Sequence, residues 1–288
     1  MTPRARQVAS REDLRSARGL LLIVREPVPP TAPVPGQPAF VASDPREGLE
    51  PLIAVWDDAS VTAFHGHVDL GTGLRTALTQ IVAEELDVEP SAVHLVMGST
   101  ALAPNQGATI ASASLQIHAK PLRIAAAQAR QWLLAQGAPT VDLVTLLNER
   151  RVELRLDLEA PVKPSEQYRI VGQSLPRIDI PAKAMGEVVF VHDMRIPGML
   201  HGRVIRPPYA GVDHGDFVGR TLESVDRNSI ANIPGIRAVV VQGDFVGVVA
   251  EREEFAELAM KTLRVNWKPW SGPGPLDDVT RAIRNNPS

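Results

Sequence analysis

Residues 66–82 constrain the fold and function of this chain more than any other segment. An apolar, β-branched stretch leads into the turn Gly71-Thr72-Gly73, and a helical pattern starts directly behind it. A turn at a helix start leaves backbone N–H groups without intrahelical partners, and these can hold an anion or an oxo ligand. Two glycines at such a turn also occur for steric reasons alone. The functional interpretation therefore depends on the flanking sequence.

Composition excludes several classes of protein. The 288 residues carry a net charge of −3, and only 4% are aromatic. The sequence therefore lacks the basic surface that binds phosphates and the aromatic side chains that stack on bases, which argues against a nucleic-acid-binding protein. The chain has no cysteine, which excludes disulfides, Cys-type zinc sites and thiolate-held iron–sulfur clusters within it. No apolar run is long enough to span a bilayer. We expect a cytoplasmic protein, with a periplasmic or membrane-associated complex as the alternative.

The chain is predicted to have four parts. Nine of the 25 prolines fall at or before Pro51, and this density predicts a proline-rich irregular arm over residues 1–50. Residues 51–150 form a first compact segment, residues 151–270 a second, and residues 271–288 a tail. The predicted fold class is α+β, with two small sheets that each carry helices on one face.

Hydrophobic spacing places the elements. In the first segment, strands are expected at 52–56, 61–64 and 93–97, and helices at 74–86, 111–136 and 141–147. Thr72 is the expected N-cap of the first helix, and Pro121 should kink or divide the long one. In the second segment, strands are expected at 152–158, 188–191, 200–205, 238–241, 246–250 and 263–267, with a helix at 253–262, and the tail should contain a short helix at 276–283.

Three motifs between Gly66 and Leu134 carry a family resemblance. They are Gly-His-Val-Asp-Leu-Gly-Thr-Gly at 66–73, Ile-Val-Ala-Glu-Glu-Leu-Asp-Val at 81–88, and Pro-Asn-Gln-Gly-Ala-Thr at 104–109, which Ala-Ser-Ala-Ser follows at 111–114. This block resembles one in the molybdenum-cofactor subunits of the xanthine dehydrogenase/aldehyde oxidase family.

A second set of motifs resembles the same family's a/b hammerhead domain. They are Arg-Ile-Asp-Ile-Pro-Ala-Lys at 177–183, His-Asp-Met-Arg-Ile-Pro-Gly-Met-Leu-His-Gly at 192–202 and Asp-Phe-Val-Gly-Val-Val-Ala at 244–250. The cofactor-type block precedes the hammerhead here, which is the order of the branch with the β-subunit of isoquinoline 1-oxidoreductase and the B subunit of nicotinate dehydrogenase. The segment Leu-Leu-Leu-Ile-Val-Arg-Glu-Pro at 20–27 and the turn Gly-Thr-Gly at 71–73 most resemble the nicotinate dehydrogenase branch.

The resemblance implies a partial molybdenum-cofactor-binding domain followed by a hammerhead-like domain. It implies part of the large subunit of a molybdenum hydroxylase, which hydroxylates an N-heteroaromatic substrate such as nicotinate with water-derived oxygen. The implied partners are an iron–sulfur small subunit and a companion chain or segment that completes the molybdenum–pterin site. The implied cofactor-binding residues are Gly71, Thr72, Gly73, Asn105, Gln106, Gly107, Ala108 and Thr109.

Departures from the family pattern leave an alternative open. Threonine stands at position 72, where the commoner family turn has glutamine. A later glycine-rich cofactor motif and the C-terminal glutamate that acts as general base are not found, so we assign no catalytic residue and no metal ligand. The chain alone is expected to be inactive, and a half-domain should leave a broad apolar face uncovered. The alternative is a non-catalytic scaffold or truncated remnant that keeps the fold without turnover.

Simpler interpretations compete at each site. Residues 71–73 can be a plain cap and tight turn, and residues 105–109 an ordinary loop in which Thr109 or Ser112 caps the long helix. His65 and His67, with Asp69 beyond, have the spacing of a metal-hydrolase ligand set, but no further ligand follows in a known motif.

We therefore expect one of these two histidines to face a polar lining and the other to lie at the surface. Glu84 and Glu85 are expected to be solvated helix charges. His192, His201 and His214 are assigned no chemistry.

Overall fold

The computed structural model describes residues 8–28, 48–140, 142–207, 220–269 and 278–285. The chain forms two compact units, Met1–Val188 and Val189–Ser288. This boundary lies later than the predicted one at 150/151. The reason is that β5 (Arg151–Arg155) pairs with β1 (Leu20–Arg25) and completes the first sheet.

The first unit is built on a five-stranded sheet in the order β4-β3-β2-β1-β5. Its other strands are β2 (Glu50–Trp56), β3 (Val61–His65) and β4 (Val93–Met97). Strands β1, β2 and β3 pair antiparallel, whereas β4 and β5 pair parallel with β3 and β1. The predicted hairpin of β2 and β3 is confirmed.

The prediction of an irregular arm over residues 1–50 is wrong for the described part. Strand β1 lies inside it, and its residues Leu20 to Val24 are at most 3% exposed. This apolar run precedes the prolines that prompted the prediction, so nothing prevents it from pairing on both edges. Helix α1 (Arg11–Ser16) lies just before it, and the Ser10 side chain caps it by accepting the Asp13 N–H. Residues 29–47 are outside the described residues.

The helices of the first unit follow the predicted pattern closely. Helix α2 (Leu74–Leu86) has the predicted bounds. The predicted long helix is divided into α3 (Ala113–Gln116) and α4 (Ala119–Ala135). Pro121 lies in the first turn of α4, where its missing N–H breaks no helical hydrogen bond. The remaining helical elements are α5 (Leu143–Leu147), α6 (Ile180–Ala184), η1 (Pro90–Ala92) and η2 (Ser165–Gln167).

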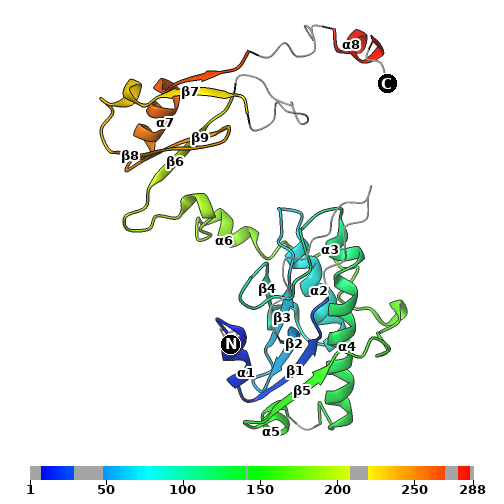
Figure 1. Ribbon diagram of the computed structural model, residues 1–288. Coiled ribbons are helices and arrows are strands. Elements are labelled where there is room, and N and C mark those ends of the chain that lie inside the picture. Colours follow the sequence, from blue (N-terminus) through cyan, green and yellow to red (C-terminus); the bar gives the residue numbers. More distant parts are fainter. Residues whose placement is uncertain (1–7, 29–47, 141, 208–219, 270–277, 286–288) are drawn as a thin grey trace. The chain divides into compact units, whose positions relative to one another are not determined.

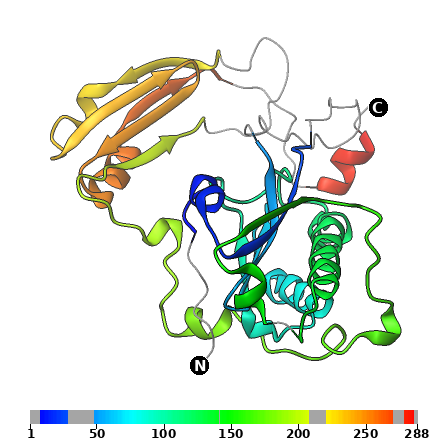
Figure 2. The same ribbon diagram turned by 90° about the horizontal axis from the view of Figure 1, so that it is seen from below.

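Side chains from alternate positions of the strands form two apolar layers. Leu21, Ile23, Val55 and Ala63 face the layer that α2 and α4 cover, whereas Leu22, Trp56 and Phe64 face a smaller layer that includes Leu14 of α1 and Leu102. Figure 2 shows α2 and α4 on one side of the sheet and α1 on the other. Both sheet faces are thus covered within the first unit (Figure 1).

The second unit contains two sheets where one was expected. Strands β6 (His201–Ile205), β9 (Phe245–Ala250) and β8 (Ile236–Gln242) form one antiparallel sheet, and β10 (Arg264–Trp267) and β7 (Leu222–Asp226) form the other. Helix α7 (Glu253–Thr262) supplies Ala259 to their shared apolar cluster with Val246 and Val248. The other elements are η3 (Val191–Asp193), η4 (Arg227–Ile230) and α8 (Val279–Asn285).

Two predictions in the second unit are wrong. No strand forms at 188–191; Val191 is 84% exposed and begins η3. Strand β7 was not predicted, because Leu-Glu-Ser-Val-Asp has weak strand propensity and forms a strand through its pairing with β10. Most of the tail, and His214, lie outside the described residues. None of the helices in the described ranges has the length and apolar content that a membrane span requires.

Candidate functional site

The turn before α2 is closed by a carboxylate from its own segment. Asp69 Oδ1 accepts the N–H groups of Gly71, Thr72 and Gly73 at 2.9, 3.0 and 3.3 Å, and Oδ2 accepts that of Arg75 at 2.9 Å. Burial raises the pKa of Asp69, but these four hydrogen bonds outweigh it and lower the pKa below its ordinary value. The N–H groups predicted to be open to an anion are therefore already occupied.

The cap of α2 also differs from the prediction. Gly73 takes the N-cap position in a left-handed conformation with φ of 79°, which glycine adopts without steric cost, and Thr72 makes no capping hydrogen bond. The turn is fixed from a second side by Arg177, whose Nη1 donates to Gly71 O at 2.8 Å. The N–H of the next residue, Ile178, donates to Thr76 Oγ1 at 3.1 Å.

A cavity of about 400 Å³ lies beside this turn. Of the residues predicted to contact a cofactor, it is lined by Thr72 and Thr109. Thr109 Oγ1 accepts the Val68 N–H at 3.0 Å, which ties the two predicted segments together. The full lining is Val68, Leu70, Thr72, Leu74, Thr109, Ile110, Ala111, Ser112, Ser114 and Leu115. The predicted residues Gly71, Gly73 and those from Asn105 to Ala108 are not part of it.

Three residues that line the cavity were not among the predicted cofactor-binding residues. Ala111 and Ser112 have positive φ angles of 54° and 56°, a conformation that non-glycine residues rarely adopt and that concentrates at functional sites. Ser114 Oγ lies 2.8 Å from His67 Nδ1. The available signal was the Ala-Ser-Ala-Ser run, whose small side chains leave room for a ligand close to the backbone.

The predicted loop 105–109 uses most of its polar groups internally. Asn105 Oδ1 accepts the Gly107 N–H at 3.2 Å, and Gln106 Oε1 accepts the Gly66 N–H at 2.7 Å. Gln106 is only 7% exposed, and its Nε2 forms no hydrogen bond with any described residue. A buried amide donor without an acceptor is costly, so this atom is the group of the loop that best fits a ligand or a bound water.

Both histidines of the predicted pair are buried, so the expectation that one lies at the surface is wrong. His65 and His67 are 0% and 1% exposed, and their rings meet that of His118 with centroid distances of 4.5 to 6.5 Å. Burial first, and then the His67 ring, lower the pKa values of both His65 and His118 to about 4. Within the described ranges, no three His, Asp or Glu side chains are arranged to hold a metal.

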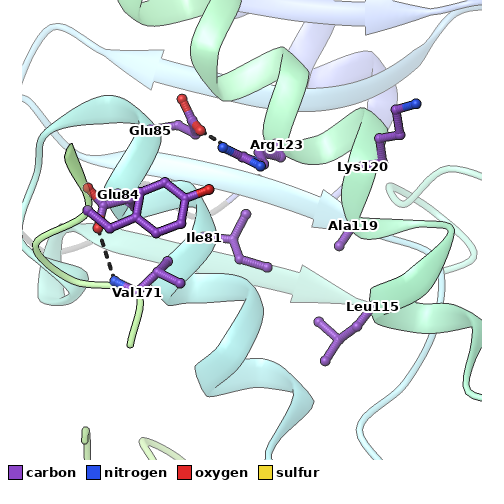
Figure 3. A pocket seen from close by; sticks show the side chains of 9 residues that line it. Ile81, Glu84, Glu85, Leu115, Ala119, Lys120, Arg123 and Val171 are labelled. Carbon is purple, nitrogen blue, oxygen red and sulfur yellow. Dashed lines mark hydrogen bonds and ion pairs between the residues drawn. The ribbon is translucent and has the colours of Figure 1, made fainter. Parts of the chain in front are cut away.

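Glu84 and Glu85 are buried, 2% and 0% exposed, and are not solvated charges as predicted. Glu84 Oε2 accepts the N–H groups of Arg169, Ile170 and Val171 at 2.9, 2.6 and 3.0 Å. Glu85 pairs with Arg123 at 2.7 Å (Figure 3).

These two glutamates line a second cavity of about 310 Å³ with Ile81, Ala119, Val171 and others. Their carboxylates are bonded within the chain, so they have a structural role.

Several apolar side chains that line the first cavity are exposed to solvent. Leu70, Leu115 and Val68 are 71%, 45% and 41% exposed. The faces of the sheet, in contrast, are covered, so the expected broad open apolar face is not found on the described part of the sheet. The lining combines these aliphatic groups with the hydroxyls of Thr72, Ser112 and Ser114, and it contains no acidic or basic side chain. Such a lining, with aliphatic walls and neutral hydroxyls, fits the ring and polar edge of a pterin.

Comparison with known proteins agrees with this geometry. Residues 10–163 match the family model described as "Molybdopterin cofactor-binding domain". The chain is 52% identical to the B subunit of nicotinate dehydrogenase from Pseudomonas putida, over 98% of this chain and 26% of that protein.

More distant relatives match over shorter stretches. The β-subunit of isoquinoline 1-oxidoreductase from Brevundimonas diminuta is 29% identical over 70% of this chain and 33% of its own length. Xanthine dehydrogenase/oxidase of Mus musculus is 34% identical over 25% of this chain and 5% of its own length. The chain thus spans only about a quarter of the first of these relatives and a third of the second. The family match covers more than half of the chain, and the chain belongs to the molybdopterin cofactor-binding domain family.

Proposed function

We propose that this chain forms part of the large subunit of a molybdenum hydroxylase and supplies one wall of its molybdopterin pocket. The observation that carries the proposal is the cavity beside the 69–75 turn, which two segments of the matched family region build together. The 52% identity to a nicotinate dehydrogenase subunit supports an N-heteroaromatic acid such as nicotinate as the substrate class.

In this proposal the chain binds and orients the molybdopterin cofactor, and it does not transfer protons. The bound cofactor would supply oxidation of a ring carbon with water-derived oxygen. The Thr72, Ser112 and Ser114 hydroxyls would donate or accept neutral hydrogen bonds to its polar edge. The aliphatic rim would exclude water from one side. Because the lining has no acid or base, the general base would lie in the part of the enzyme that this chain does not span.

Two partners belong to the same proposal. An iron–sulfur subunit would take up the electrons, because a chain without cysteine holds no thiolate-bound cluster. A companion segment or chain would cover the exposed aliphatic residues at the rim, since patches of this kind mark interaction sites. We also propose that the second unit is hammerhead-like, on the basis of its motifs and of an antiparallel sheet packed against α7. The proposed location is the cytoplasm.

A non-catalytic scaffold is the second candidate function. The observation that favours it is the lining itself, which offers binding groups but no group for proton transfer among the described residues. The two candidates differ in cofactor content, because a scaffold without turnover has no need to retain molybdenum or pterin.

Metal and pterin analysis of the protein, isolated together with everything that binds it, tests the proposal. We expect molybdenum and pterin in near-equal amounts in the wild-type complex. The substitution Thr72→Trp should fill the cavity without removing a side-chain hydrogen bond and should abolish cofactor binding. The control Leu134→Trp adds an indole at an exposed position of α4 (53% exposed) outside the cavity lining and should leave binding unchanged. A wild-type complex without either component, or full occupancy in Thr72→Trp, would contradict the proposal.

A further inference from the structure

The loop that carries Gln106 is held by a buried group of charges outside the cavity. Glu50, at the start of β2, is 1% exposed, and its Oε1 accepts the Asn105 N–H at 2.6 Å. Arg11 Nη2 donates to Ala103 O at 2.8 Å, and Arg25 Nη2 lies 3.4 Å from Asn105 O. Three charged side chains from the N-terminal part of the unit therefore fix the backbone directly before Gln106.

Glu50 faces both arginines of this group, so two positive charges share one carboxylate. Arg25 Nε and Nη2 both lie 2.9 Å from Glu50 Oε2, and Arg11 Nη2 lies 3.9 Å from Oε1. The side chains of Arg25 and Arg11 are only 12% and 11% exposed. Buried ion pairs often add little net stability because desolvation cancels the attraction. The property that they do provide here is a fixed geometry for the loop backbone.

That geometry decides where the Gln106 amide points. The Gln106 side chain is fixed at its Oε1 by the Gly66 N–H, and its backbone carbonyl lies 3.1 Å from His67 Nε2. With Asn105 held by Glu50 on one side and these contacts on the other, Gln106 Nε2 stays buried without an acceptor among the described residues. An orphaned donor persists only where the surrounding structure enforces it.

We propose that Glu50, with Arg25 and Arg11, is the positioning group for the 103–108 loop, which leads directly into Thr109 of the cavity lining, and thereby sets the affinity of this chain for its ligand. Glu50 does not itself touch the ligand; it acts through the Asn105 backbone. The inference rests on the proposed function for the identity of the ligand, which is molybdopterin, but the fixed loop can be measured independently of any ligand.

The test compares Glu50→Gln with the control Glu153→Gln in the full protein isolated with its partners. Glu153 lies on β5 and pairs with Arg151, and its side chain is 37% exposed. The control therefore makes the same chemical change at a residue that does not contact the 103–108 loop. We expect amide hydrogen exchange of the 103–108 peptide to be at least tenfold faster in Glu50→Gln, with several-fold lower molybdopterin content. Far-UV circular dichroism and the exchange of α4 should stay unchanged.

Every outcome decides the inference. Unchanged exchange at 103–108 in a folded Glu50→Gln protein overturns it, and so does faster exchange with full cofactor content. If the wild-type complex holds no pterin, the proposed function fails, and the exchange result alone then decides whether Glu50 positions the loop. If Glu50→Gln does not fold, Arg25→Lys replaces it, because it keeps the charge but loses the Nε contact. A smaller acceleration at the same peptide is expected, and its absence overturns the inference.

Discussion

The strongest stability prediction concerns Glu84, the buried carboxylate that joins α2 to residues 163–171. Burial raises its pKa, but the N–H groups of Ile170, Val171 and Arg169, followed by Lys163, lower it from 4.5 to about 2. A difference of that size between the folded and unfolded chain corresponds to about 3 kcal/mol of stability at pH 7. Because the folded pKa is the lower one, this contribution is complete above pH 4.5 and is lost as the pH falls toward 2.

The substitution Glu84→Gln removes the charge and keeps the shape. The amide oxygen can face the same three N–H groups but carries no charge, and its N–H₂ turns toward Lys163, so we expect a loss of about 3 kcal/mol at neutral pH. The loss of protection should appear first near the substituted residue. Residues 169–171 should exchange their amide hydrogens much faster, and the effect should reach Gly71, which Arg177, a few residues further along the chain, contacts.

Native-state hydrogen exchange of the α2 and 165–175 peptides at pH 7, 5 and 3.5 measures this effect. The gap between wild type and Glu84→Gln should shrink as the pH falls. Glu166→Gln is the matched control, because Glu166 lies in the same stretch but is exposed, and it should change nothing measurable. A gap below about 1 kcal/mol at pH 7, or one that does not change with pH, would refute the linkage argument.

Two further predictions concern the walls of the candidate site. The pKa values of His65 and His118 are both about 4, against 6.5 when unfolded, so the free energy of unfolding, measured by urea and by exchange of the β3 peptide, should fall by about 3 kcal/mol for each of them as the pH falls from 6.5 to 4. His65→Asn should make this dependence shallower and leave the part that His118 contributes, and an equally steep curve in the variant would contradict the assignment. A Cβ at Gly66 would lie 2.2 Å from Pro104 O, whereas one at Gly107 meets nothing within 4 Å. In thermal unfolding, Gly66→Ala should cost about 1–3 kcal/mol through the clash, and Gly107→Ala only the left-handed backbone penalty of about 1 kcal/mol; equal costs would refute the comparison.

Local patterns in the sequence predicted the local elements well. The bounds of α2 and the hairpin of β2 and β3 follow from apolar spacing over neighbouring residues. The long helix is divided as predicted, but the break lies at residues 117–118, and Pro121 falls in the first turn of α4. Strand β1 was missed because the proline count was applied to the whole of residues 1–50. The pairing of β5 with a strand more than a hundred residues earlier was also missed, because no local pattern in the sequence indicates it.

The eight predicted cofactor-binding residues stay a prediction. The structure places two of them, Thr72 and Thr109, beside one cavity. The electrostatic roles could not be predicted, because the partners of Glu84 and Glu85 lie up to 87 residues away along the chain. An acidic residue on a helix can be buried only if such distant donors pair with it. The helical periodicity of the neighbouring sequence gives no information about them.

Two carboxylates explain which kind of ligand the first unit can take. Asp69 and Glu50 each accept backbone N–H groups at a turn or loop that sequence motifs indicate as a binding element. Their negative charges already occupy those donors, so an anionic group at the same N–H groups would meet like charge. The hydroxyls of Thr72 and Ser112 in the lining remain for a ligand, because those of Thr109 and Ser114 already bond Val68 and His67. A ligand held by this chain should therefore be recognised through neutral hydrogen bonds and apolar contact, with its anionic groups bound elsewhere in the assembled protein.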